Sequence, residues 1–171
     1  MLGEQGLGKT CPSPLPDWLT MELNCFSRAP HVVGDKLHKP QILLADDHQG
    51  LLDVVSTLLE PYFEVVGVVG DGESLLKSAV ELKPDVIVTD ISMPVLNGID
   101  AAIKLKELGS ISKIVFLTIH GGPDYVRACL ATGAFGYVVK TQMTADLLRA
   151  IREALAGRIF ISPHVPHGGE N

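Results

Sequence analysis

The sequence has 171 residues, of which 46% are hydrophobic and 20% are charged, with a formal net charge of −6 at pH 7. This length and composition predict one folded domain with tails and exclude an intrinsically disordered chain. The acidic balance argues against direct nucleic-acid binding, which needs a basic surface, and no apolar run approaches the roughly 20 residues of a membrane span.

Residues 1–40 are predicted to form a flexible N-terminal tail, because prolines are frequent there and no apolar periodicity is maintained. The tail contains Gly3-Glu-Gln-Gly-Leu-Gly-Lys-Thr10, which fits the phosphate-binding pattern G-x-x-x-x-G-K-S/T. That motif works between a strand and a helix, whereas Pro12, Pro14 and Pro16 exclude a helix here. A nucleotide hydrolase is therefore strongly disfavoured.

From Gln41 onward, short apolar runs alternate with amphipathic segments. The apolar runs predict strands at residues 42–45, 64–68, 86–88, 114–117 and 135–139. The amphipathic segments predict helices at residues 51–59, 72–82, 99–108, 124–131 and 144–155. Thr144 is the predicted N-cap of the last helix, and Gly157 is its predicted stop. Five strand–helix repeats with short connections predict a parallel sheet with helices on both faces.

The cysteines and the C-terminal histidines give weaker signals. Cys11, Cys25 and Cys129 are odd in number and lack a C-x-x-C spacing, which indicates free thiols in a reducing cytoplasm. His164 and His167 have a spacing found in metal sites, but no partner ligands lie near them in the sequence. A solvated C-terminal tail is the favoured interpretation of that segment.

Polar side chains follow four of the predicted strands. Asp46 and Asp47 follow the first strand, Asp90 the third, Thr118 the fourth and Lys140 the fifth. In open α/β sheets, ligands bind outside the carboxyl ends of the strands, so these side chains are expected to meet. Crowded carboxylates need a neutralising cation, and an oxygen-only ligand set favours Mg²⁺. A metal ion, a lysine and a hydroxyl around a carboxylate suit a phosphoryl group. Taken alone, Asp90 could equally be a loop cap.

These residues carry a family resemblance. With Asp90-Ile-Ser-Met-Pro94, Gly98 and Gly136-Tyr-Val-Val-Lys140, they resemble the receiver domain of two-component response regulators. Thr118-Ile-His120 and the segment from Gly157 to Pro163 are further similar to the NarL/FixJ branch. Receivers of that branch precede a helix-turn-helix domain, which this sequence does not contain.

The resemblance implies a flavodoxin-like (CheY-like), doubly wound fold. Its five parallel strands would have the order 2-1-3-4-5, with helices on both faces. The expected organisation is a flexible tail over residues 1–40, a receiver domain over residues 41–158 and a linker or tail over residues 159–171.

The resemblance also implies how a Mg²⁺ ion is bound and where the phosphoryl group attaches. Asp90 would accept the phosphoryl group from a phosphohistidine of a sensor histidine kinase or of a phosphotransfer protein. Asp47, Asp90 and the backbone carbonyl of Ser92 would ligate Mg²⁺ directly, while Asp46 would act largely through bound water.

Three further residues receive roles from the resemblance. Lys140 would pair with the phosphoryl group, Thr118 would hydrogen-bond to it, and Tyr137 would be the aromatic switch. A half-buried packing role for Tyr137 and a capping role for Thr118 remain as alternatives. One departure from many receivers is Ile119, a bulky residue next to the switch threonine, which is expected to hinder water and prolong the phosphorylated state.

The predicted function is a cytoplasmic phosphorelay receiver that switches a protein-interaction surface, and that forms a homodimer on phosphorylation as one option. It would assist its own phosphorylation and dephosphorylation without being an enzyme for a separate substrate, and it would bind neither nucleic acid nor membrane. The alternatives are a receiver fragment of a DNA-binding transcriptional regulator and a degenerate receiver that acts only as a scaffold.

Overall fold

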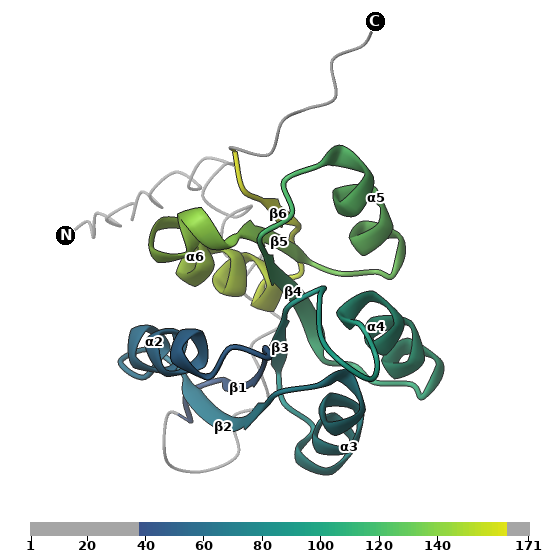
Figure 1. The fold of residues 1–171 in the computed structure, drawn as a ribbon. Helices are drawn as coiled ribbons and strands as arrows, with labels where there is room; N and C mark the ends of the chain where they lie inside the picture. Colours follow the sequence, from purple (N-terminus) through teal and green to yellow (C-terminus); the bar gives the residue numbers. More distant parts are fainter. Residues whose placement is uncertain (1–37, 164–171) are drawn as a thin grey trace, which may run out of the picture. The chain divides into compact units, whose positions relative to one another are not determined.

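The computed structural model describes residues 38–163 (Figure 1). The motif from Gly3 to Thr10 that fits the phosphate-binding pattern lies outside these residues, as do His164 and His167. Strands and helices alternate through the described part of the chain, as β1 (Gln41–Ala45), α2 (Gln49–Leu59), β2 (Glu64–Val69), α3 (Gly72–Leu82), β3 (Val86–Thr89), α4 (Gly98–Glu107), β4 (Lys113–Thr118), α5 (Pro123–Ala131), β5 (Gly136–Val139), a 3₁₀ turn (Lys140–Gln142), α6 (Met143–Leu155) and β6 (Phe160–Ile161).

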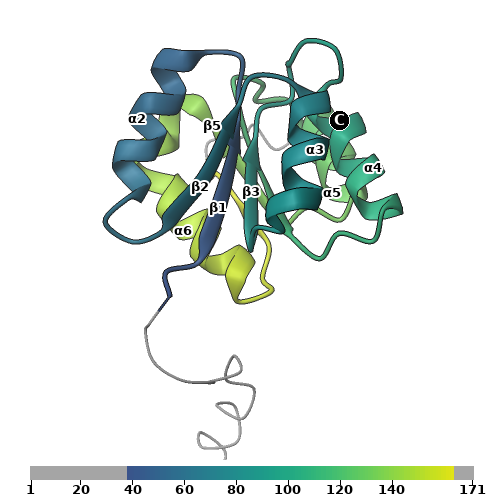
Figure 2. The same ribbon diagram turned by 90° about the horizontal axis from the view of Figure 1, so that it is seen from below.

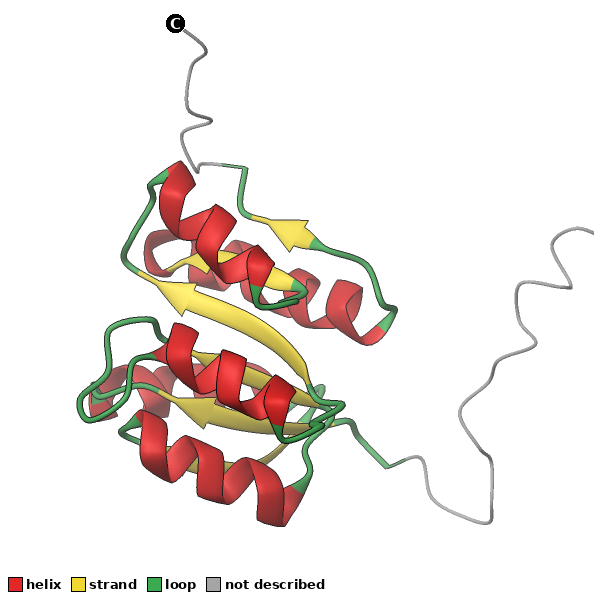
Figure 3. Cartoon of the chain, turned by 90° about the vertical axis from the view of Figure 1, so that its right-hand side faces the viewer, coloured by secondary structure: helices red, strands yellow, loops and turns green. Residues whose placement is uncertain are grey.

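The strands form one parallel sheet in the order β2-β1-β3-β4-β5-β6. The predicted order 2-1-3-4-5 is confirmed, and a sixth strand extends it. Figure 3 shows the strands as a single twisted layer with helices on both sides of it. This arrangement brings the carboxyl ends of β1, β3, β4 and β5 to one edge of the sheet, where the candidate site residues follow.

The two faces of the sheet have separate hydrophobic cores, because alternate strand residues point to opposite sides. Ile42 and Leu44 of β1 pack in the core under α2 and α6. Leu43 and Ala45 of the same strand pack in the core under α3, α4 and α5. Figures 1 and 2 show these two helical layers on either side of the strands. The central strands are therefore covered on both faces, as the doubly wound fold requires.

Local signals set most of the helix ends. The Asp71 carboxylate caps α3 by accepting hydrogen bonds from the amides of Glu73 and Ser74 at 2.9 and 2.8 Å. Gly157 ends α6 with a φ of 74°, as predicted. The prediction of Thr144 as the N-cap of α6 is wrong. The 3₁₀ turn leads directly into α6, whose first residue, Met143, is buried in the core.

The sixth strand lies beyond residue 158, in the segment for which the sequence predicted a linker or tail. The amide of Phe160 donates to the carbonyl of Phe135, and the amide of Ser162 donates to the carbonyl of Tyr137, both at 2.9 Å. Ser162 is fully buried, and its hydroxyl donates to the Asp146 carboxylate at 2.7 Å. A strand of two residues is too short to show a hydrophobic alternation, so the sequence pattern gave no sign of it.

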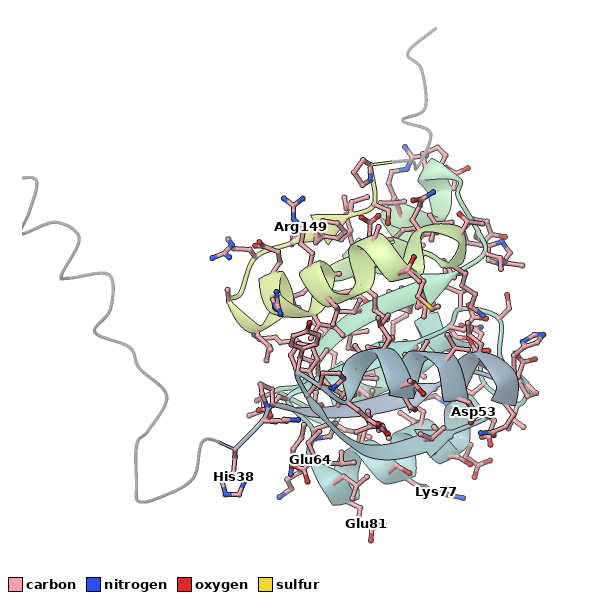
Figure 4. The ribbon with its side chains drawn as sticks, turned by 90° about the vertical axis from the view of Figure 1, so that its left-hand side faces the viewer. His38, Asp53, Glu64, Lys77, Glu81 and Arg149 are labelled. Carbon is pink, nitrogen blue, oxygen red and sulfur yellow. The ribbon has the colours of Figure 1, made fainter. Side chains whose placement is uncertain are left out.

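Charged side chains cover the outside of the helices. Figure 4 shows Asp53 on α2, Lys77 on α3 and Arg149 on α6 projecting away from the sheet, with His38 before the first strand. Among the described residues, none of the helices is long and apolar enough to cross a membrane.

Candidate functional site

Two aspartates occupy adjacent strand ends at the carboxyl edge of the sheet. Asp46 follows β1 and Asp90 follows β3, and each retains only 3% of its surface exposed. Their backbone amides still belong to the strand ladder. The Asp90 amide donates to the carbonyl of Ala45 at 2.9 Å, and the Asp46 amide donates to the carbonyl of Val69 at 3.1 Å. The sheet therefore fixes both carboxylates before any ligand arrives.

Lys140 joins these two carboxylates. Its Nζ lies 2.6 Å from Asp46 Oδ2 and 2.9 Å from Asp90 Oδ2, and only 12% of its side chain is exposed. Burial lowers the pKa of Lys140, but its hydrogen bonds to Asp46 and Asp90 outweigh this effect, so the pKa lies above its ordinary value. The lysine is therefore a permanent cation beside Asp90, as the sequence predicted.

Two of the predicted metal ligands, Asp46 and Asp47, lie together with one unexpected neighbour, His48. Asp47 is exposed, and its Oδ1 lies 2.8 Å from His48 Nδ1, which is also 3.4 Å from Asp46 Oδ1. Carboxylate oxygens of this kind fit a hard divalent cation such as Mg²⁺. His48 was missed by the sequence reasoning, although it directly follows the acidic pair in the sequence.

The loop after Asp90 folds back against the Asp90 backbone. The amide of Gly98 donates to the carbonyl of Ile91 at 2.9 Å, and a Cβ atom added to Gly98 would lie only 1.9 Å from the Asp90 carbonyl oxygen. Within the loop, Val95 has a φ of 68°, and the amide of Leu96 donates to the carbonyl of Pro94 at 2.7 Å. This tight turn around a β-branched residue is strained backbone beside the candidate site.

Thr118 and Tyr137 are connected through the backbone of His120. Thr118 ends β4, is fully buried, and its hydroxyl accepts a hydrogen bond from the His120 amide at 3.3 Å. Among the described residues, it makes no hydrogen bond with Asp90 or Lys140. The hydroxyl of Tyr137 donates to the carbonyl of His120 at 2.7 Å.

Tyr137 is a buried core residue in this structure. Its ring is fully covered, so the alternative of a half-buried strand residue is wrong. Burial is the main cause that raises the pKa of its phenol, with smaller contributions from nearby Cys129, Tyr125 and Asp90. The phenol therefore stays protonated and can act as the hydrogen-bond donor to the His120 carbonyl.

The side chain of His120 connects two segments that the sequence reasoning left apart. Its Nε2 lies 3.0 Å from the hydroxyl of Ser92, in the loop after Asp90. Its ring stacks on Tyr125 of α5, with centroids 4.2 Å apart and planes 15° apart. The only sequence signal was the position of His120, two residues after Thr118.

Ile119 lies at the opening of the site. It is 68% exposed and lines an open depression at the carboxyl edge of the sheet. The depression, of about 550 Å³, is also lined by Lys140 and by residues 47–51. A molecule that approaches Lys140 through this depression therefore meets the Ile119 side chain.

Comparison with known families decides the class of the protein. The family model for the response regulator receiver domain matches residues 42–152. The chain belongs to this family. Within the matched residues, Asp46, Asp90, Thr118 and Lys140 lie at the ends of β1, β3, β4 and β5.

Curated relatives place the receiver in the NarL/FixJ branch. The transcriptional regulatory protein DegU of Brevibacillus brevis is 40% identical over 133 residues, which cover 76% of this chain and 56% of DegU. The nitrate/nitrite response regulator protein NarL of Escherichia coli (strain K12) is 37% identical over 123 residues, which cover 71% of this chain and 57% of NarL. The chain thus spans just over half the length of these relatives.

Solved structures share the fold. A two-component response regulator of the LuxR family from Aurantimonas sp. SI85-9A1 superposes with a TM-score of 0.71 at 31% identity, covering 74% of this chain and 92% of that one. The isolated receiver domain of RcsB from Salmonella enterica serovar Typhimurium, with the phosphomimetic BeF3−, gives a TM-score of 0.69 at 28% identity, covering 75% and 96%. These likenesses agree with the CheY-like architecture of the described residues.

Proposed function

We propose that this receiver accepts a phosphoryl group on Asp90 from a phosphohistidine of a sensor histidine kinase or of a phosphotransfer protein. The observation that carries the proposal is the Lys140 ammonium, which lies 2.9 Å from Asp90 Oδ2 while both side chains are largely buried. A fixed cation beside a buried carboxylate can neutralise charge that accumulates on a transferring phosphoryl group.

The transfer exchanges one phosphorus bond for another. A carboxylate oxygen of Asp90 attacks phosphorus, the bond between phosphorus and the donor histidine breaks, and the histidine takes up a proton as it leaves. Asp90 then carries an acyl phosphate, and Lys140 and the Thr118 hydroxyl are the groups proposed to bind its oxygens. Hydrolysis of the acyl phosphate by water returns the carboxylate of Asp90 and releases inorganic phosphate. In this proposal the chain assists its own phosphorylation and dephosphorylation and does not act on a separate substrate.

Mg²⁺ is the proposed cofactor of both reactions. The carboxylates of Asp47 and Asp90 and the backbone carbonyl of Ser92 would hold the ion, with Asp46 acting largely through bound water. When bound, the ion supplies positive charge to the phosphoryl oxygens. The carboxylate oxygens of Asp46 and Asp47, which lie together at the strand edge, support this assignment.

The proposed output is a change in the surface formed by α5, β5 and α6, which a second copy or another protein recognises. Tyr137 lies on β5, and its hydroxyl is tied to the loop that leads into α5. A receiver that takes its phosphoryl group from a sensor histidine kinase would act in the cytoplasm. The second candidate is the receiver part of a DNA-binding transcriptional regulator, because the curated relatives include a transcriptional regulatory protein that is about twice as long as the matched segment.

Phosphorylation by a small donor tests the acceptor. We expect Mg²⁺ and acetyl phosphate to add one phosphoryl group to the wild-type chain, in a form that hydroxylamine removes. Asp90→Ala should prevent labelling because it removes the nucleophile. The matched control is Asp53→Asn, a change in an exposed aspartate on α2 that should label like the wild type (Figure 4). Labelling of the Asp90→Ala chain to the wild-type level, measured by intact mass, would show that the acceptor is elsewhere.

The exposed Ile119 tests access to the acyl phosphate. Ile119→Ala should shorten the lifetime of the phosphorylated state, because the smaller side chain opens the depression to water. Ile111→Ala is the control, since Ile111 is an exposed isoleucine at the opposite edge of the sheet. The lifetime is measured as loss of phosphorylated mass over time. An unchanged or longer lifetime in Ile119→Ala would contradict the steric role.

A further inference from the structure

His120 receives contacts from four different segments of the receiver. Its amide donates to Thr118 at 3.3 Å, and its carbonyl accepts from Tyr137 at 2.7 Å. Its ring nitrogen Nε2 lies 3.0 Å from the hydroxyl of Ser92, and its ring stacks on Tyr125 at 4.2 Å. Among the described residues, no other residue of the loop between β4 and α5 makes a hydrogen bond or an aromatic stack with more than one of these partners.

We propose that the His120 ring is a positioning group for the aromatic switch. The ring is clamped between Ser92 and Tyr125, and this clamp holds the His120 carbonyl at the point that the Tyr137 hydroxyl reaches. The inference rests on the proposed function, because it gives His120 a place between the acceptor loop and the output surface.

The sequence around His120 explains why a clamp is needed. Gly121 and Gly122 follow it directly, and glycine permits more backbone conformations than any other residue. The loop therefore has little intrinsic preference for one path. Side-chain contacts of His120 supply that preference by tying the loop to Ser92 on one side and to α5 on the other.

Loss of the clamp has a defined consequence for Tyr137. Its hydroxyl lies in a buried environment and has the His120 carbonyl as its partner. A buried hydroxyl that loses its partner is unfavourable, because it has already lost its contacts with water. If the loop moves, the Tyr137 hydroxyl loses this hydrogen bond. It can regain a partner by bonding to water, which requires the tyrosine ring to rotate out of the core.

The same ring connects the acceptor to the output helix. Ser92 lies two residues after Asp90, and Tyr125 lies in the first turn of α5. A rearrangement of the loop after Asp90 therefore reaches α5 through one side chain. This route is additional to the Thr118 and Tyr137 pair, which contacts only the backbone of His120.

Chemical nitration of tyrosine measures the position of the Tyr137 ring. The sequence has three tyrosines, and Tyr62 is 49% exposed, which makes it an internal reference. In the wild-type chain, tetranitromethane should modify Tyr62 and spare Tyr137. His120→Ala should raise the rate at Tyr137 by about tenfold or more, because the open conformer becomes well populated, while the rate at Tyr62 stays unchanged. His38→Ala, at the start of the described chain, is the matched control and should leave Tyr137 protected (Figure 4).

Three milder variants separate the contacts of the ring. Ser92→Ala removes the hydrogen bond, Tyr125→Leu removes the stack, and His120→Phe keeps an aromatic ring but not the nitrogen. We expect each to raise nitration of Tyr137 by less than His120→Ala does. Ser92 and Tyr125 are exposed, so these variants decide the matter even if His120→Ala fails to fold. Wild-type protection of Tyr137 in both Ser92→Ala and Tyr125→Leu would overturn the proposal.

The nitration result is independent of phosphoryl transfer, since it is measured without a phosphodonor. A wild-type chain that is not labelled on Asp90 would reject the proposed function and leave the nitration result standing. Unchanged protection of Tyr137 in the variants, with normal labelling of Asp90, would reject the role of His120 alone.

Discussion

The two edges of the sheet have different types of residue in the left-handed backbone conformation. At the edge where the strands begin, the helix ends turn through Gly109, Gly133 and Gly157, with φ of 76°, 92° and 74°, and through Lys83, with φ of 48°. At the edge where the strands end, the left-handed residue is Val95, with φ of 68°. Glycine adopts this conformation without steric cost, whereas a β-branched residue is strained by it. Among the described residues, the only β-branched residue in this conformation therefore lies in the loop after Asp90, whereas the starting edge has three glycines and the unbranched Lys83.

The two edges also differ in how exposed their lysine side chains are. At the starting edge, the exposed Lys39 donates from Nζ to the carbonyl of Glu60 in contact with solvent. At the finishing edge, Lys140 is nearly buried between Asp46 and Asp90. Exposed polar contacts contribute little to stability, while removal of one partner from a buried set leaves a charge without compensation. Substitutions at the finishing edge should therefore have the larger effects.

The largest effect is expected from Gly98→Ala. The added Cβ would lie 1.9 Å from the Asp90 carbonyl oxygen, so the backbone at Asp90 must move. We expect a loss of about 3 kcal/mol in the free energy of unfolding, at the upper end of the usual cost of overpacking. Urea denaturation followed by circular dichroism measures it.

Gly50→Ala is the matched control for Gly98→Ala. Gly50 lies in α2 and has nothing within 4 Å of an added Cβ. The substitution should stabilise the receiver by up to about 1 kcal/mol, because alanine favours the helix over glycine. Equal effects of the two alanines would show that the loop after Asp90 is not tightly packed.

A smaller loss is expected from Gly157→Ala at the starting edge. An added Cβ meets nothing within 4 Å there, so the only cost is the φ of 74°. Left-handed backbone costs a non-glycine residue about 1–2 kcal/mol. Gly157→Asn should lose less, because asparagine tolerates this conformation. The pair is compared by thermal denaturation, and an alanine variant as stable as the wild type would contradict the strain argument.

Val95→Gly should have the opposite sign. Glycine relieves the strain at a φ of 68°, and the lost side chain is 79% exposed, so little packing disappears. We expect a gain of about 1 kcal/mol, since the relieved strain exceeds the entropy that glycine adds to the unfolded chain.

The control for Val95→Gly is Ile111→Gly at the starting edge. Ile111 is 91% exposed and does not have a positive φ, so only the entropic effect remains and stability should fall. Urea denaturation of both variants gives the comparison. A loss of the same size at both positions would show that Val95 stores no strain.

The smallest effect concerns the acid dependence of stability at Asp71. Hydrogen bonds, first from Ser74 and then from Glu73, hold the pKa of Asp71 below its ordinary value of 3.8. A lowered folded pKa means that the stabilisation is present above pH 3.8 and is lost as the pH falls through the folded pKa. Asp71→Ala should therefore lower the melting temperature at pH 7, with a difference that shrinks in acid.

Asp71→Asn separates the cap from the charge. Asparagine is a good N-cap but does not titrate, so its melting temperature should exceed that of Asp71→Ala near pH 3 and should fall below the wild type at pH 7. A difference between the wild type and Asp71→Ala that is constant from pH 7 to pH 3 would contradict the assignment. Circular dichroism melting curves at several pH values provide the measurement.

The fold was predictable because its elements carry strong periodic signals. Buried strands such as β3, which begins with the apolar run from Val86 to Val88, give a strong signal, and their alternation with amphipathic helices leaves few topologies open. The same topology predicts that Asp46, Asp90 and Lys140 meet, since parallel strands end at one edge. Sequence reasoning failed at β6 and at Thr144, where a contact with β5 and the burial of Met143 override the local signal.

The parts of the site that escaped prediction depend on side-chain orientation. His120 is one residue in a loop, and nothing in its spacing shows that its ring would stack on Tyr125 and reach Ser92. His48 was also missed, because the predicted ligand set contained oxygen ligands alone, yet its imidazole lies beside Asp47. Periodicity places backbones on faces and edges, but it does not give the rotamers on which such contacts depend.

The sixth strand determines where this domain can safely be cut. A chain that stops at residue 158 loses the amides of Phe160 and Ser162, so the carbonyls of Phe135 and Tyr137 become an unpaired sheet edge. An open edge of this kind is a template for pairing with another chain and therefore a route to aggregation. We therefore expect the shortest fragment that resists aggregation to end after Ser162, because the residues of β6 cover the edge of β5, the strand that carries Tyr137.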